Sequence, residues 1–223
     1  MRREKLEELK DYISELKTIK KEKLKEEYIY QDNIPVGRKG FLNIEKYKCY
    51  LNNGQEMTRE KIRKGGTDKS ACIIMPVTSD NKTILVVQPR LSTIEGVSVE
   101  LPAGYVEEGE YKETAALREL AEETGYISNN LIYLDKFYQD QACGVSAYNY
   151  AFLAKNCVKV QEQNLDKDEF IKYFECDVAD AYELIDLGYI TDIQSKYTME
   201  KAKQYIKIIK ERRNICEIMV TLE

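Results

Sequence analysis

Histidine and tryptophan are both absent from this sequence of 223 residues. Without histidine, the chain has no Ser-His or Cys-His nucleophile pair, no imidazole general base and few ways to build a zinc site. Any chemistry must therefore use carboxylates, Lys, Arg, Tyr or Cys. Oxygen ligands of this kind favour a hard cation such as Mg²⁺ or Mn²⁺.

Long apolar runs are missing as well, because no stretch approaches the roughly 20 residues that a membrane span needs. The first residues read MRREK, and the segment that follows stays highly charged, unlike a signal or transit peptide. We therefore expect a cytoplasmic protein that does not bind membranes. The six cysteines are scattered without a CxxC pair, so we expect reduced and mostly buried thiols.

The formal net charge is -5, which argues against duplex nucleic acid as a partner. A phosphorylated small molecule is compatible with this charge. Its binding would then need a local arginine and a metal ion to offset the general repulsion.

The length suits one full domain with a substantial extension. We predict an N-terminal extension over residues 1–65, made of a helix and a β-hairpin, and a catalytic domain over residues 66–223 that ends in a helix. Residues 2 to about 26 form the first predicted helix, with an apolar stripe at Leu6, Leu9, Ile13 and Leu16. That stripe suits either packing on its own domain or a contact in a dimer.

Alternating patterns and turn residues predict the remaining elements. Asn53-Gly54 lies between two candidate strands, 45–52 and 55–62, and predicts a tight hairpin. Gly125 suits the left-handed position after a helix over 113–124. Further strands are predicted at 71–77, 83–88, 131–138, 148–153 and 170–176, and further helices at 178–187 and 199–213.

One motif carries the chemistry: residues 104–110 read GYVEEGE, and residues 118–125 read RELAEETG. On a helix, Glu119, Glu122 and Glu123 lie three or four residues apart and crowd one face. Their repulsion costs a few tenths of a kcal/mol per pair, and a divalent cation would more than reverse it. A merely solvated acidic face would not require Gly104 or Glu110 upstream of the helix.

This pattern resembles the box of the Nudix hydrolase family, and the resemblance extends over about residues 66–190. It implies an α/β/α sandwich, of the α/β (α+β) class, with a mixed sheet and a loop-helix-loop that holds Mg²⁺, for which Mn²⁺ is a possible substitute. By resemblance the metal ligands are Glu119, Glu122 and Glu123, while Glu110 supports the loop, Arg118 orients carboxylates and Gly104 lets the backbone approach the phosphates. Tyr126 departs from the family pattern, which prefers an aliphatic residue there.

The flanking segments, Glu100-Leu-Pro-Ala-Gly104 and Gln88-Pro89-Arg90, resemble the ADP-ribose pyrophosphatase branch of the family. This resemblance implies that the Ala103 carbonyl binds the metal and that Arg90 clamps phosphates, a role suited to its bidentate donors. It also places Glu100 and Gly104 at the substrate. An acidic loop would supply a carboxylate that activates water: Glu169, or alternatively Asp168 or Glu162.

Two features differ from that branch. In the loop after the box, Cys143 replaces a proline and Tyr148 replaces an acid. Relatives in that branch often stack adenine on a tryptophan from the N-terminal strands, and this chain has none. The resemblance implies that a tyrosine replaces it, with Tyr28, Tyr30, Tyr47 and Tyr50 as candidates; the alternative is that these are ordinary packing residues.

The resemblance implies a homodimer and a nucleoside diphosphate-linked substrate. The leading hypothesis is hydrolysis of ADP-ribose or a related nucleoside diphosphate sugar to a nucleoside monophosphate and a sugar phosphate. The alternatives are a Nudix hydrolase of nucleoside triphosphates or dinucleotides, and a nucleotide-sugar sensor without turnover.

Overall fold

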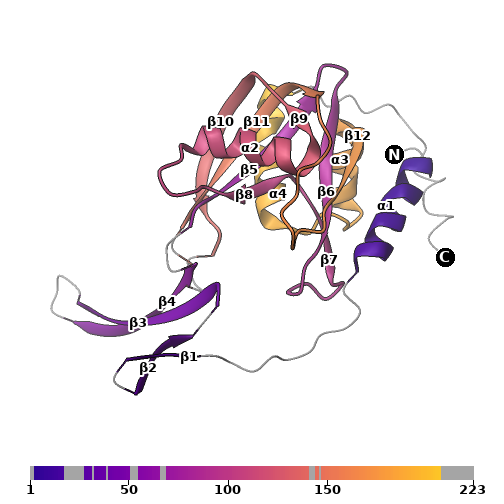
Figure 1. Ribbon diagram of the computed structural model, residues 1–223. Coiled ribbons are helices and arrows are strands. Elements are labelled where there is room, and N and C mark those ends of the chain that lie inside the picture. Colours follow the sequence, from indigo (N-terminus) through magenta and orange to yellow (C-terminus); the bar gives the residue numbers. More distant parts are fainter. Residues whose placement is uncertain are drawn as a thin grey trace.

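The structure, a computed structural model, describes residues 3–17, 28–31, 33–38, 40–50, 55–65, 69–140, 144–145 and 147–206. An eight-stranded mixed sheet forms its centre (Figure 1). Its strands are β5 Ala71–Thr78, β6 Lys82–Pro89, β7 Val97–Glu100, β8 Ala103–Tyr105, β9 Tyr126–Ile127, β10 Asn130–Tyr138, β11 Tyr148–Lys159 and β12 Lys172–Asp177. The main path runs β10-β11-β5-β6-β12, with β11 and β5 parallel and the other pairs antiparallel.

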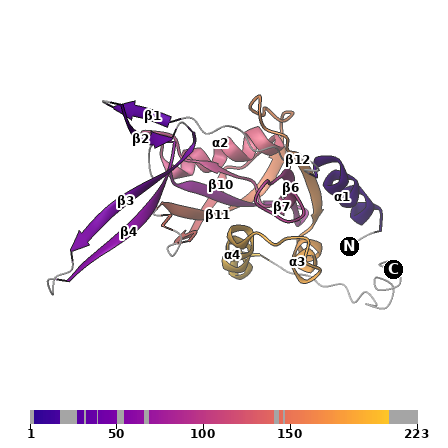
Figure 2. The same ribbon diagram turned by 90° about the horizontal axis from the view of Figure 1, so that it is seen from below.

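Helices cover both faces of the sheet. Successive residues of a strand point to opposite faces, so Ile73 and Met75 of β5 enter one apolar core while Cys72 and Ile74 enter the other. The helices are α1 Arg3–Leu16, α2 Lys112–Thr124, α3 Val178–Asp186 and α4 Ile193–Ala202. Figure 2 shows α2 on one side of the sheet and α3 and α4 on the other, which confirms the predicted sandwich.

The sheet splits at its centre. Strands β5 and β6 pair only at Val77 and Thr83 and then diverge. The gap is filled by β7, which pairs with β6, and by β8, which pairs with β5. The Ile74 N–H donates to the Pro102 carbonyl at 2.9 Å, which fixes the turn between β7 and β8. Segment 100–104 therefore lies inside the sheet, next to α2.

The first helix packs on its own domain. Leu9 is fully buried, and Ile13 and Leu16 pack against the same core. Of the two roles considered for the apolar stripe, the structure thus shows the intramolecular one. The helix ends at Leu16, ten residues before the predicted end at about residue 26, and residues 18–26 lie outside the described part of the chain.

The predicted hairpin is confirmed by β3 Leu42–Tyr50 and β4 Glu56–Lys64, which pair from Leu42↔Lys64 to Tyr50↔Glu56. The turn itself lies outside the described residues. A second hairpin, β1 Tyr28–Gln31 with β2 Ile34–Arg38, precedes it and is not among the strands predicted from the sequence. Figures 1 and 2 show β3 and β4 projecting from the sandwich. These two strands, called the β3–β4 ribbon below, join the sandwich where the Ile62 N–H of β4 donates to the Gly144 carbonyl at 3.0 Å.

The prediction of the last helix was wrong at its start. Helix α4 begins at Ile193 rather than at residue 199, because the Asp192 carboxylate caps it by accepting from the Ser195 N–H at 2.7 Å. It ends at Ala202 and continues as a short 3-10 turn, η1 Lys203–Tyr205, so the helix also ends before the predicted residue 213; residues 207–213 lie outside the described part of the chain. None of the helices in the described residues is both long and apolar enough to cross a membrane.

Candidate active site

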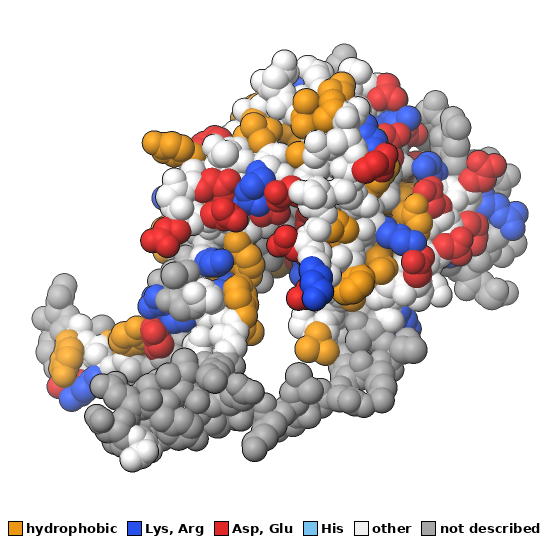
Figure 3. Space-filling view, in the orientation of Figure 1, with side chains coloured by type: hydrophobic (Ala, Val, Ile, Leu, Met, Phe, Trp, Pro, Cys, Tyr) orange, Lys and Arg blue, Asp and Glu red, His pale blue; other side chains and the backbone are white. Residues whose placement is uncertain are grey.

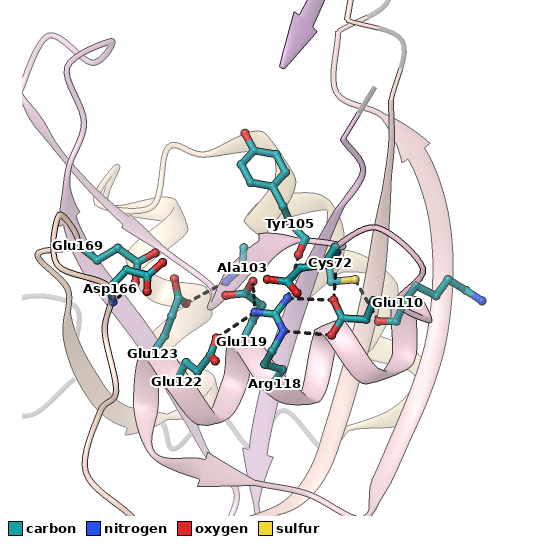
Figure 4. A network of polar contacts seen from close by, with 12 residues as sticks. Cys72, Ala103, Tyr105, Glu110, Arg118, Glu119, Glu122, Glu123, Asp166 and Glu169 are labelled. Atoms are coloured by element: carbon teal, nitrogen blue, oxygen red, sulfur yellow. Dashed lines mark hydrogen bonds and ion pairs between the residues drawn. The ribbon is translucent and has the colours of Figure 1, made fainter. Parts of the chain in front are cut away.

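Arg118 joins the loop before α2 to the acidic face of that helix (Figure 4). Its Nε and Nη2 each donate to the Glu110 carboxylate at 3.0 Å, and Nη2 also donates to the Tyr105 carbonyl at 3.0 Å. Its Nη1 donates to Glu119 at 2.8 Å and to Glu122 at 2.9 Å. The guanidinium therefore fixes the loop and two helix carboxylates relative to one another, and the hydrogen bonds that it donates, together with its charge, lower the pKa of Glu110.

Glu119 and Glu123 form the buried part of this acidic group. Glu123 is almost fully buried and accepts a hydrogen bond from the Ala103 N–H at 3.0 Å. Burial raises its pKa well above the usual value, and the charges of Glu119 and Glu169 add to that shift. Burial also raises the pKa of Glu119, while Arg118 opposes the change. Such crowding of buried carboxylates favours a bound cation, because a cation offsets both desolvation and mutual repulsion.

Gly104 leaves the space that the Glu119 carboxylate occupies. A Cβ built at residue 104 would lie 2.0 to 2.2 Å from the carboxyl atoms of Glu119. This close approach places Glu119 against the backbone of β8, one residue from Ala103, whose carbonyl is the fourth predicted ligand. The donors fit a hard divalent cation such as Mg²⁺. Among the described residues, no three acidic or thiol side chains lie close enough together to share one metal ion as they are placed. Arg118 Nη1 contacts two of the predicted ligands, Glu119 and Glu122, and both would have to turn towards a bound ion.

A cavity of about 760 Å³ opens over these glutamates. Its lining includes all three glutamates predicted as metal ligands, together with Ala103, Gly104, Arg118, Arg90, Glu100 and Glu169. Figure 3 shows acidic side chains gathered around a basic one on this part of the surface. The structure thus brings together most of the site residues predicted from the sequence.

Arg90 lies in the cavity as one half of an ion pair. Its Nε donates to Glu100 Oε1 at 2.8 Å and its Nη2 to Glu100 Oε2 at 2.5 Å. Gln88 Nε2 donates to the same carboxylate at 3.2 Å. Glu100 is itself mostly buried in β7. The pair therefore holds the arginine in a fixed orientation at the cavity wall.

The acidic loop reaches the cavity through Glu169 and through Asp166, which the sequence did not single out. The two residues are joined by backbone and side-chain contacts: the Glu169 N–H donates to the Asp166 carbonyl at 3.0 Å, and the Asp166 N–H donates to Glu169 Oε2 at 3.1 Å. The alternatives Asp168 and Glu162 do not line the cavity. Glu162 instead lies 3.5 Å from Lys159.

An unpredicted tyrosine, Tyr105, lines the cavity. Its ring lies 5.6 Å from that of Phe41, and the ammonium groups of Lys64 and Lys69 lie 5.6 and 5.8 Å from its centroid. Tyr47 and Tyr50 lie instead on the projecting ribbon, 44% and 70% exposed, and do not line the cavity.

The remaining residues singled out in the sequence lie outside the described part of the chain or pack on another side chain. The side chains of Tyr28 and Tyr30 and all of Cys143 lie outside the described part of the chain. Tyr148 stacks on Tyr138, with ring centroids 4.4 Å apart.

Comparison with known proteins gives three findings. The NUDIX domain family matches residues 67–195. The chain is 33% identical over 178 residues to an ADP-ribose pyrophosphatase of Bacillus subtilis (strain 168), covering 79% of this chain and 92% of the relative. It is also 33% identical over 161 residues to a methanol dehydrogenase activator of Bacillus methanolicus, covering 72% and 83%.

Among solved structures, a crystal structure of an ADP compounds hydrolase superposes with a TM-score of 0.63 at 20% identity, covering 85% of this chain and 96% of that one. This likeness shows a shared fold.

Replacing Gly104 tests whether the close approach to Glu119 builds a cation site. We expect Gly104→Ala to weaken binding of Mg²⁺ or Mn²⁺ to the substrate-free protein by about 10-fold or more, because the new methyl group displaces a ligand. Isothermal titration calorimetry measures this affinity. Gly109→Ala is the control: Gly109 lies in the loop after β8, where a Cβ would meet open space, and its φ of 78° adds backbone strain without displacing a carboxylate. Equal affinities in the two variants would contradict the assignment.

Proposed function

The chain belongs to the NUDIX domain family and is a pyrophosphohydrolase of the ADP-ribose pyrophosphatase branch, and we propose that it hydrolyses ADP-ribose or a related nucleoside diphosphate sugar. The products would be a nucleoside monophosphate and a sugar phosphate. The observation that carries the proposal is the cavity in which the acidic face of α2, the 100–104 segment and Arg90 meet. The name of the Bacillus subtilis relative, of which the match covers 92%, supports the substrate class.

The cation in this proposal is Mg²⁺, with Mn²⁺ as a substitute. Glu119, Glu122 and Glu123 would hold it together with the Ala103 carbonyl. When bound, such an ion polarises a phosphoryl oxygen, lowers the pKa of the attacking water and neutralises the leaving group.

Arg118 and Arg90 have different roles in this proposal: Arg118 positions carboxylates, and Arg90 binds a phosphate. Arg118 holds Glu119 and Glu122 at hydrogen-bond distance, so these carboxylates stay side by side before any ligand arrives and would turn from the guanidinium to the ion. Arg90 directs Nε and Nη2 at Glu100, and among the described residues its Nη1 has no hydrogen-bond partner. That nitrogen is the donor we assign to a phosphate oxygen of the substrate.

Glu169 is our candidate for the general base that accepts a proton from the attacking water. It is exposed, it lines the cavity, and its charge acts on both Glu119 and Glu123. Asp166 shares this position and is the second candidate. Asp168 and Glu162 are less favoured, because neither lines the cavity.

The alternatives differ in how well the site supports them. A sensor without turnover would not need a complete set of oriented glutamates, whereas this site keeps Glu119, Glu122 and Glu123 together. Hydrolysis of nucleoside triphosphates or dinucleotides would use the same glutamates, so the choice of substrate depends on the cavity wall.

We also propose a homodimer in which a second copy covers the β3–β4 ribbon. A lone two-stranded ribbon is only marginally stable in water. This one exposes Leu42, Ile44 and Tyr50. A partner surface would bury these side chains and pair the open strand edges.

Removing a metal ligand tests the reaction class. Glu122→Gln and Glu123→Gln should each lower turnover about 100-fold or more with little loss of fold, since each removes a charged oxygen ligand. Turnover is measured on nucleotide sugars, dinucleotides and nucleoside triphosphates with Mg²⁺, and the products are identified by mass. Full activity in both variants would rule out the metal assignment. Saturable binding without turnover in the unmodified protein would favour the sensor.

Truncating Tyr105 tests its role at the nucleotide. If the base stacks on this ring, Tyr105→Ala raises KM about 10-fold, in line with roughly 1 to 3 kcal/mol per stacked base. Tyr50→Ala, on the projecting ribbon, is the matched control. Steady-state kinetics of both variants give the two KM values. A larger change in KM for Tyr50→Ala than for Tyr105→Ala would place the stacking residue on the ribbon.

Charge placed on the ribbon tests the dimer. Ile44→Lys with Leu42→Lys should convert the dimer into monomers, because two ammonium groups would have to be desolvated in the interface. Light scattering after size exclusion gives the mass of each form. A monomeric unmodified chain, or a double variant that stays dimeric, would refute the proposal.

A further inference from the structure

The acidic loop has few contacts that fix its position. Residues 166–170 are all exposed, and the loop carries both candidate bases. A carboxylate on such a segment acts as a base only if the loop is held at a set distance from α2. Whether Glu169 or Asp166 can act as a base therefore depends on the contacts at the two ends of the loop.

Gln163 closes the neck of this loop. Its Nε2 donates to the Ile171 carbonyl at 3.2 Å, so the residues just before and just after the loop are joined. The same nitrogen donates to the Glu123 carbonyl at 2.5 Å. One side-chain amide thus uses both of its protons to tie the loop to the backbone of a proposed metal ligand.

The backbone on either side of Gln163 follows the end of α2 closely. The Asn164 N–H donates to the Glu122 carbonyl at 2.9 Å, and the Val160 N–H donates to the Gly125 carbonyl at 3.0 Å. A Cβ at Gly125 would lie 2.0 Å from the Gln161 carbonyl oxygen, so only glycine permits this approach. Carbonyls in the last turn of a helix have no partner within the helix. Here segment 160–164 supplies those partners.

We propose that Gln163 is a positioning residue, which sets the distance between the loop carboxylate and the glutamates of α2. The inference rests on the proposed function, because it acts through Glu169 or Asp166. Gln163 itself does not line the cavity. Its loss would leave substrate and cation binding almost unchanged while the base moves, and a misplacement of about 1 Å costs on the order of 100-fold in rate.

Gln163→Met tests the proposal, since it keeps the length of the side chain and removes both donors. We expect kcat to fall about 10- to 100-fold, with KM and the affinity for Mg²⁺ changed less than about threefold. Gln161→Ala is the matched control from the same segment: the Gln161 side chain is exposed, and its contact with Gly125 uses only the backbone. Unchanged kcat in Gln163→Met, or an equal loss in Gln161→Ala, would overturn the proposal.

A double-mutant cycle separates positioning from general damage to the fold. In a Glu169→Gln background, Gln163→Met should lower kcat by less than about twofold, because the group it positions is already lost. The same fold-loss in both backgrounds would mean that Gln163 only supports the structure, and would overturn the proposal.

The cycle also separates this proposal from the assignment of Glu169. Full activity in Glu169→Gln would refute that assignment alone, and the cycle is then run with Asp166→Asn. Coupling of Gln163 to Asp166 would support positioning of the other carboxylate. Coupling to neither would overturn the proposal.

Discussion

The contact between Arg118 and the carboxylates around it is the interaction on which the site depends. Four distances of 2.8 to 3.0 Å join this guanidinium to Glu110, Glu119 and Glu122, and a fifth contact reaches the Tyr105 carbonyl. A lysine at this position would offer one nitrogen where the guanidinium offers three in a fixed plane. The loop and the helix are therefore held in one geometry by a single side chain, and the acidic groups stay together despite their repulsion.

The split in the sheet brings a second group of residues to Arg118 and its partners. Because β5 and β6 pair only at Val77 and Thr83, next to the turn that joins them, and diverge away from that turn, the 100–104 segment fits between them. Backbone groups of this segment then meet α2: the Ala103 N–H contacts Glu123, and Gly104 adjoins Glu119. The Ser195 hydroxyl accepts a hydrogen bond from the Leu101 N–H at 2.9 Å, so the start of α4 supports the same segment from the other side. The fold thus sets the backbone of this segment directly against the carboxylates of α2.

Site residues whose contacts lie close in the sequence were predicted better than residues whose contacts lie far away in the sequence. The glutamates and Arg118 were predicted because their contacts lie within one helix and the loop before it. The acidic turn was found, but its orientation was not, since it depends on the bond from Gln163 to Glu123 across 40 residues. Tyr105 was missed for the same reason: its neighbours Phe41 and Lys64 come from the N-terminal ribbon. The apolar stripe of α1 left two choices open, because an amphipathic helix buries the same face against its own domain or against another.

The exposed position of Glu169 follows from the charge of the cluster. Glu119 and Glu123 already carry the cost of burial, which appears as their raised pKa values. A further carboxylate buried beside them would add both desolvation and repulsion. On an exposed loop, Glu169 stays hydrated, while Gln163 anchors the neck of the loop and Asp166 binds Glu169 within it. Attachment at the neck therefore provides the fixed distance that burial would otherwise supply, and it does so without adding a buried charge.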